Sequence, residues 1–235
     1  GILNREGGVL FAERIVTDLA ELLRLEGVPL HPESRVEAVD MEAARITLAD
    51  GTQVRAEAVV LAAGAWSYKL RPGLARKAEA HRQAVVYTEP PERYRASWRE
   101  APALVDLGAV LDVYAAPPAG GTDLKFGLAQ HRRPGDPDAM DPLGRDEPAE
   151  IFAQVAPFLQ QAEDYRILGG RLCPYAVSPD ERFVVEREGP SLVVTGCTGH
   201  MFKFGALMGR EIGRTVTGER GFDDFAAWAR GEQAA

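Results

Sequence analysis

Cysteine is scarce in this sequence, and long apolar runs are absent. The two cysteines, Cys173 and Cys197, are too few for a secreted disulfide framework and too far apart for a zinc knuckle. No apolar run approaches the roughly 20 residues that span a bilayer, and the N-terminus lacks the basic-then-apolar layout of a signal peptide. We therefore expect a cytoplasmic protein with no membrane part and no bound metal.

A concentrated basic region is also missing. The formal net charge is −8, and the acidic residues are scattered along the chain. Nucleic acids and anionic membranes attract basic surfaces, so neither is an expected partner. The short basic cluster His131-Arg132-Arg133 precedes a proline- and glycine-rich stretch, and we predict a solvated loop there.

The composition that remains, 46% hydrophobic and 26% charged, is typical of a soluble globular protein. Apolar residues recur at helical spacing from Ala12 to Glu26, and Gly27 follows where a helix-ending glycine belongs. The run Ala58 to Gly64 is apolar at successive positions, which predicts a strand buried on both faces of a parallel sheet. Another buried strand, Leu192 to Thr195, and a helix from Ala206 to Val216 continue the α/β pattern. Shorter strands are predicted at 35–39, 45–48 and 53–55.

Between Lys77 and Arg171 the pattern changes to short strands separated by proline- and glycine-rich turns. Strands are predicted at 84–88, 103–106, 110–115 and 123–128, and a helix between Pro148 and Leu159. The predicted fold is therefore α/β plus an antiparallel β insert, with domains at 1–76, 77–171 and 172–235. The chain begins Gly1-Ile2-Leu3 without an initiator methionine, so we expect a fragment of a longer protein.

The segment Gly196 to Gly205 joins a predicted strand to a predicted helix and is rich in small residues. Glycines let backbone amides approach a planar or anionic ligand, and the start of a helix adds partial positive charge. His200 and Lys203 place an imidazole and a cation on the same loop. This pattern indicates a ligand pocket; the alternative is a surface lysine beside a hydrogen-bonded loop histidine.

Motifs along the chain resemble one family of flavoenzymes. Gly196 to Lys203 is similar to the Gly-Xaa-Ser-Gly-His-Gly-Phe-Lys signature of the monomeric sarcosine oxidase and N-methyltryptophan oxidase type, within the FAD-dependent D-amino-acid-oxidase-like superfamily. Cys173 to Phe183 resembles the family's Cys-Xaa-Tyr-Thr-Xaa-Thr-Pro-Asp-Glu-His-Phe segment. Asp123 to Gly127 resembles its Gly-Leu-Lys-Leu-Gly strand, and Val60 to Trp66 resembles its Ala-Gly-Ala-Trp crossing. These motifs occur in the family's order across nearly the whole chain.

The sequence also departs from the family's pattern. Thr198 replaces a serine and keeps the hydroxyl, whereas Met201 replaces a glycine and brings a bulky side chain. Ala129 stands where the sarcosine oxidases have an active-site histidine, and His131 is two residues late. No Gly-Xaa-Gly-Xaa-Xaa-Gly follows a strand, although this superfamily opens with that ADP-binding unit. The resemblance therefore implies a Rossmann-like FAD-binding domain, interrupted by a mixed-sheet substrate domain, whose N-terminal βαβ unit is absent.

The resemblance also implies roles for individual side chains. Cys173 would be joined through sulfur to the 8α-methyl of the flavin, with an inert buried cysteine as the alternative. Lys125 would lie over the reactive edge of the flavin and assist its reaction with oxygen, or else point to solvent from a half-exposed strand. Lys203 would bind a substrate carboxylate. Tyr114 and Tyr175 would line the substrate cavity, or belong to the core.

The implied cofactor is FAD, and the implied catalytic residues are Lys125, His200 and Lys203. Further FAD contacts are implied for Val36, Gly64, Trp66, Gly196, Thr198, Gly199, His200, Met201, Phe202 and Lys203. The expected reaction oxidises an amine or N-methyl amino acid to an imine, with O2 reduced to hydrogen peroxide. Two alternatives remain: a non-catalytic fragment without FAD, and a flavin dehydrogenase that passes electrons to another acceptor.

Overall fold

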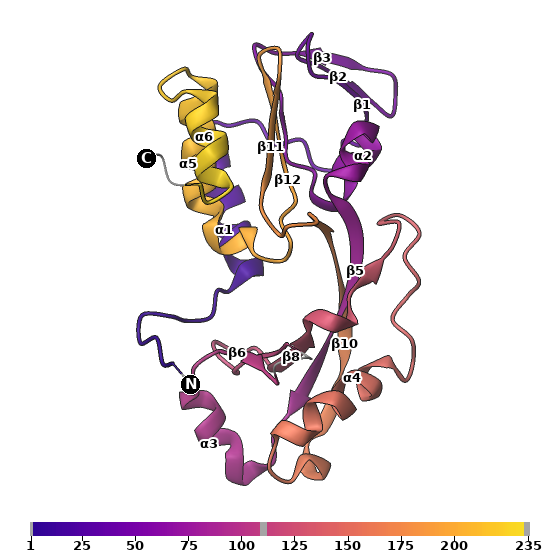
Figure 1. Cartoon of the computed structure of the whole chain (residues 1–235), viewed down its shortest axis with the longest axis vertical. Coiled ribbons are helices and arrows are strands. Elements are labelled where there is room, and N and C mark those ends of the chain that lie inside the picture. Colours follow the sequence, from indigo (N-terminus) through magenta and orange to yellow (C-terminus); the bar gives the residue numbers. More distant parts are fainter. Residues whose placement is uncertain (1, 109–111, 233–235) are drawn as a thin grey trace. The chain divides into compact units, whose positions relative to one another are not determined.

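The computed structural model describes residues 2–108 and 112–232 (Figure 1). The backbone forms two compact units, and each unit combines two separate stretches of chain. Unit 1 contains Gly1–Leu10 and Arg82–Pro174, and unit 2 contains Phe11–His81 and Tyr175–Ala235. Among the described residues, no helix has the length and apolar character needed to cross a membrane.

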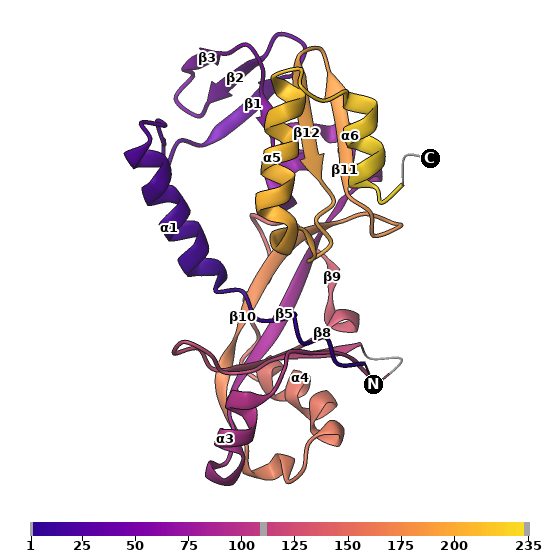
Figure 2. The same cartoon turned by 90° about the vertical axis from the view of Figure 1, so that its left-hand side faces the viewer.

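Unit 2 carries two small sheets and the helices around them. Its helices are α1 (Ala12–Leu25), α2 (Ser67–Leu70), α5 (Gly205–Val216) and α6 (Phe222–Ala229), with short 3-10 helices at Gly64–Trp66, Pro72–Arg76 and Met201–Phe204. Its strands are β1 (Val36–Asp40), β2 (Arg45–Leu48), β3 (Gln53–Arg55), β4 (Val60–Leu61), β11 (Val184–Glu188) and β12 (Ser191–Thr195). One sheet has the order β1-β2-β3, and the other has the order β11-β12-β4 with β12 and β4 parallel. Figure 1 and Figure 2 show α5 and α6 side by side along the β11–β12 hairpin.

The strands of the second sheet are buried to very different degrees. Every residue of β12 is buried, which confirms the predicted strand at 192–195. The prediction for Ala58 to Gly64 was wrong in length, because only Val60 and Leu61 form a strand, and Val60 is 40% exposed. Gly64 adopts a φ of 53° and turns the chain into a 3-10 helix, which ends the run of extended residues.

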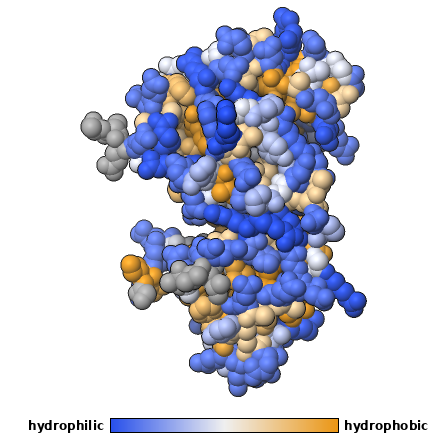
Figure 3. All heavy atoms as spheres, turned by 45° about the vertical axis from the view of Figure 1, so that its right-hand side comes forward, coloured by the Kyte–Doolittle hydropathy of each residue, from blue (hydrophilic) through white to orange (hydrophobic). Residues whose placement is uncertain are grey.

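The predicted N-terminal helix is confirmed as α1, and Gly27 follows it with a φ of 78°. None of the residues of α1 is buried, and Leu19 and Leu22 are each 51% exposed. Surface apolar patches also appear among the hydrophilic residues in Figure 3. Within the described part of the chain, the apolar face of α1 is therefore left uncovered.

Unit 1 is built on an antiparallel sheet, as the sequence predicts for the insert. Its strands are β5 (Glu79–Glu89), which begins in unit 2, β6 (Leu104–Leu107), β7 (Val113–Ala116), β8 (Leu124–Leu128), β9 (Arg133–Pro134) and β10 (Arg166–Val177), which ends in unit 2. The helices are α3 (Glu92–Glu100) and α4 (Glu147–Val155), with 3-10 helices at Ala129–His131, Ala156–Phe158 and Ala162–Asp164. The strand order is β10-β5-β8-β7-β6, and β9 pairs with β5. Residues 110 and 111 of the strand predicted at 110–115 lie outside the described residues.

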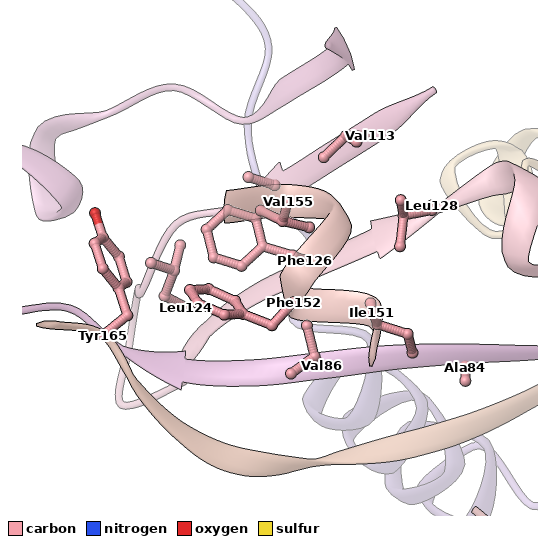
Figure 4. Packing of buried hydrophobic residues seen from close by; sticks show 11 residues of the cluster. Ala84, Val86, Val113, Leu124, Phe126, Leu128, Ile151, Phe152, Val155 and Tyr165 are labelled. Atoms are coloured by element: carbon pink, nitrogen blue, oxygen red, sulfur yellow. The ribbon is translucent and has the colours of Figure 1, made fainter. Parts of the chain in front are cut away.

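The core of unit 1 lies between one face of this sheet and α4 (Figure 4). Alternate residues of β8, namely Leu124, Phe126 and Leu128, are each at most 1% exposed and belong to this cluster. Phe126 contacts Phe152 of α4, with ring centroids 6.3 Å apart. Because successive side chains of a strand point to opposite faces, the residues between them lie on the other face of the sheet.

Candidate functional site

The face of the unit 1 sheet opposite the core carries polar and reactive side chains. Lys125 pairs with Tyr87 of β5 on one side, and Tyr114 of β7 pairs with Gly127 on the other. Cys173 of β10 lies on this face too, because Leu172 packs against the core on the opposite one. The structure thus brings together Lys125, Tyr114 and Cys173, which the sequence places far apart.

Lys125 lies against the aromatic ring of Tyr114. The Lys125 Nζ is 5.8 Å from the ring centroid, a cation–π contact worth about 0.5–1 kcal/mol at an exposed site. Gly127 makes this arrangement possible, because a Cβ at that position would overlap the Tyr114 ring. The lysine is half-buried and its charge stays on the open face of the sheet.

Cys173 is half-buried in unit 1 beside two cations. Burial raises the pKa of its thiol, because a low-polarity environment disfavours the thiolate, while Lys125 and Arg171 act in the opposite direction. Burial also raises the pKa of the neighbouring Tyr87, and Arg171 opposes that shift as well. The sequence did not single out Arg171 or Tyr87; strand alternation around Cys173 was the available signal.

The glycine-rich loop of unit 2 forms a tight turn after β12. Gly196, Thr198 and Gly199 have φ values of 65°, 44° and 72°, all in the left-handed region. For the β-branched Thr198 this conformation costs about 1–3 kcal/mol. Its backbone N–H donates to Ala176 O at 2.8 Å, and its hydroxyl accepts from the Ser178 N–H at 3.3 Å. These bonds fix the loop against the end of β10.

The residues after Gly199 point in several directions. His200, Phe202 and Lys203 are exposed, and the Lys203 Nζ lies 5.7 Å from the ring centroid of Phe204. Met201 packs against the buried cluster of α5, α6 and the β11–β12 hairpin, so its side chain contributes to the core of unit 2. A Cβ on Gly199 would lie 3.7 Å from the Tyr175 ring, which places this tyrosine beside the loop.

The FAD contacts predicted at Val36, Gly64 and Trp66 also lie in unit 2. Thr195 donates a hydrogen bond to Gly64 O at 3.4 Å, so Gly64 lies next to the end of β12. A Cβ on Gly64 would meet nothing within 4 Å, and its neighbour Trp66 is 39% exposed. A flat ligand can therefore approach the backbone at Gly64. Val36 is half-buried at the start of β1 and pairs with Leu48.

The prediction of a solvated loop at His131-Arg132-Arg133 was wrong for His131. Its Nε2 lies 3.0 Å from Glu147 Oε1, and Glu147 is only 8% exposed. Arg82, 2% exposed, donates to both oxygens of the same carboxylate at 2.6 and 2.7 Å. Charge pattern along the sequence could not reveal this cluster, because its members come from β5, a 3-10 helix and α4.

Among the described residues, no group of three or more His, Cys, Asp and Glu side chains is arranged to hold a metal ion. The chemistry available is that of a lysine, a thiol and tyrosines on an antiparallel sheet, with a glycine-rich strand-to-helix loop in the other unit. These features describe a mixed α/β fold in which an antiparallel sheet carries reactive side chains on one face.

The family description "FAD dependent oxidoreductase" (DAO) matches residues 1–215, and the chain belongs to this family. It is 27% identical over 226 residues to a monomeric sarcosine oxidase of Bacillus sp. (strain NS-129), covering 92% of this chain and 58% of that protein. It is 28% identical over 223 residues to an N-methyl-L-tryptophan oxidase of Citrobacter koseri, covering 89% of this chain and 57% of that one. The chain thus spans well under two thirds of the length of these curated relatives.

Solved structures share the fold. A thermally stable mutant of fructosyl peptide oxidase superposes with a TM-score of 0.73 at 17% identity, covering 94% of this chain and 57% of that chain. L-proline dehydrogenase from P. horikoshii superposes with a TM-score of 0.71 at 19% identity, covering 94% and 61%. The mixed α/β fold with an antiparallel sheet therefore matches this family over part of its length.

Proposed function

We propose that this chain is part of an FAD-dependent oxidase of a secondary or primary amine, with N-methyl amino acids as the substrate class. One observation carries the proposal: the sheet face on which Lys125, Tyr114 and Cys173 meet. This sheet face belongs to a chain of the FAD-dependent oxidoreductase family that is similar to sarcosine and N-methyltryptophan oxidases.

The residues present fit FAD. Gly64 leaves open space at its backbone, and the left-handed turn at Gly196 to Gly199 provides small residues at the end of a buried parallel strand. Open backbone of this kind suits a planar or phosphate-bearing ligand. We assign contacts with FAD to Gly64, Trp66, Gly196, Thr198 and Gly199, and a thioether bond with the flavin to Cys173.

When bound, FAD would supply the redox chemistry, which is oxidation at the carbon beside the amine with O2 as the final acceptor. The protein supplies charge and orientation. The Lys125 ammonium stabilises negative charge that develops on oxygen, and the Lys203 ammonium pairs with the carboxylate of the substrate. Tyr114 in unit 1 and Tyr175 in unit 2 are each assigned a contact with the substrate, for which an aromatic ring favours the neutral amine.

The fold proposed for the whole enzyme is a Rossmann-like FAD-binding domain interrupted by a substrate domain. The parallel β12–β4 pair and α5 would belong to the FAD-binding domain, and the antiparallel sheet of unit 1 to the substrate domain. Among the described residues β4 has a partner on one side only, and Val60 on it is 40% exposed. We place the phosphate-binding βαβ unit of the family at this free edge, outside the present chain.

A covalent flavin is the first prediction to test. After acid precipitation of the flavin-loaded protein, the yellow colour should remain in the pellet, and Cys173→Ser should release it to the supernatant. Cys197→Ser is the matched control, because this cysteine donates a weak hydrogen bond to Ala176 O in unit 2. A colourless wild-type pellet would contradict the proposed thioether bond. Flavin in neither fraction would favour a non-catalytic fragment.

Replacing Lys203 tests the substrate class. Lys203→Ala should raise the KM for N-methyl amino acids by about tenfold to a hundredfold, since a charge-assisted hydrogen bond contributes about 1.5–3 kcal/mol. The KM for an amine without a carboxylate should not change. Steady-state kinetics on both substrates give the comparison, and equal KM values for the variant and the wild type on the amino acid would contradict the assignment.

A further inference from the structure

A second cation lies beside Cys173 on the open face of the unit 1 sheet. Arg171 and Cys173 are two residues apart on β10, and side chains with this spacing point to the same face of a strand. Leu172 between them packs against the core on the opposite face. The exposed Arg171 therefore shares a face with the sulfur of Cys173.

Titratable groups reach this face from the neighbouring strands. Arg171 acts on Tyr87 of β5 and opposes the rise that burial causes in the pKa of its phenol. Lys125 of β8 pairs with Tyr87 through the backbone, and Asp123, just before β8, adds to the rise that burial causes in the pKa of Tyr87. Tyr114 of β7 lies beyond Lys125. Lys125, Arg171 and Tyr87 thus interact with the thiol directly, whereas Asp123 acts on Tyr87 and Tyr114 contacts Lys125.

These groups have opposing effects on the thiol. Burial disfavours the thiolate and raises the pKa of Cys173, and the two cations lower it. The thiolate, not the thiol, is the nucleophilic form of cysteine, so the balance between burial and positive charge sets its reactivity. Lys125 already has a proposed role with oxygen. Arg171 precedes the motif that begins at Cys173, and no role so far accounts for it.

We propose that Arg171 is a positioning residue for Cys173: its guanidinium, on the same face of β10, stabilises the sulfur in the form that attacks electrophiles. In this step the thiol proton leaves to water, and the negative charge that remains on sulfur faces the guanidinium. The inference rests on the proposed function only for the electrophile, the 8α carbon of the flavin. There a C–S bond would replace a C–H bond, the proton would leave to water, and the two electrons would pass through the flavin to O2. The charge pairing itself requires no flavin and can be measured without it.

The test uses alkylation of the flavin-free chain by iodoacetamide in a Cys197→Ser background, so that Cys173 is the single thiol. The rate at pH 7 should fall by on the order of threefold to tenfold in Arg171→Gln, the range for a cation about 7 Å away in a largely solvated setting. The midpoint of the rate–pH profile should move upward. Arg171→Lys should keep most of the wild-type rate, and about 1 M salt should slow the wild type toward the Gln variant.

Arg166→Gln is the matched control, because Arg166 is exposed on the same strand but pairs with Glu89. It should alkylate like the wild type, with far-UV circular dichroism showing all variants folded alike. A wild-type rate–pH profile in Arg171→Gln would overturn the proposal, and so would an equal slowing in Arg166→Gln. If alkylation depends on Arg171 while acid releases all flavin, the Arg171–Cys173 pairing stands and the covalent flavin does not.

Discussion

Lys125→Met should slow the reaction of the reduced flavoprotein with oxygen by about three powers of ten. A positive charge about 4 Å from developing superoxide contributes on the order of 4 kcal/mol at an effective dielectric near 20, and methionine keeps the length of the side chain without the charge. Stopped-flow reoxidation in aerated buffer measures this rate. Reduction by substrate under anaerobic conditions should change much less, because the charge acts on oxygen.

The outcome for Lys125→Met also separates an oxidase from a dehydrogenase. Lys77→Met is the control, since Lys77 forms an exposed ion pair with Glu186 in unit 2. Both variants should react with an artificial electron acceptor at the wild-type rate. If Lys125→Met leaves oxygen uptake unchanged, the lysine has no role with oxygen, and a dehydrogenase that passes electrons to another acceptor becomes the better proposal.

Glu147→Gln should lower the free energy of unfolding by about 3–5 kcal/mol, because it leaves the Arg82 guanidinium buried without its counter-charge. Urea or thermal unfolding followed by circular dichroism measures the change. Glu150→Gln on the same helix is the control, since Glu150 is exposed and should change stability by less than about 0.5 kcal/mol. Equal losses in the two variants would mean that the buried pair contributes no special stability.

The same carboxylate should make stability depend on pH. The hydrogen bond from Arg82 is the largest cause that lowers the pKa of Glu147 from 4.5 to about 2. The unfolded chain therefore binds the proton more tightly, so this contribution is complete above pH 4.5 and is lost as the pH falls toward 2. The loss amounts to about 3 kcal/mol at 1.36 kcal/mol per pKa unit, and Glu147→Gln should abolish this part of the pH dependence.

The spacing of apolar residues predicted many of the helices and strands, because burial of one face imposes that spacing. The α1 and α5 helices and the buried strand β12 follow directly from apolar spacing. The longest strand, β10, was not predicted, because Gly169, Gly170 and Pro174 usually mark turns rather than strand interiors. Tertiary pairing with β5 overrides these local preferences.

The sequence could predict which residues belong to the candidate site, but not that they lie next to one another. Motifs singled out Lys125 and Cys173, whereas only strand pairing shows that they share a face with Tyr114 and Arg171. The ion pair of Arg82 with Glu147 was missed because its partners are 65 residues apart in the sequence. No local sequence pattern around a buried arginine indicates which carboxylate it pairs with.

The absence of a side chain at Gly127 has an evolutionary consequence. Its strand neighbour Tyr114 occupies the space that any larger residue would need. A larger residue at position 127 would therefore require the Tyr114 ring to move, or a smaller residue to replace Tyr114 first. Because the tyrosine ring also borders Lys125, drift at this pair would alter the surroundings of the ammonium group without touching the lysine itself.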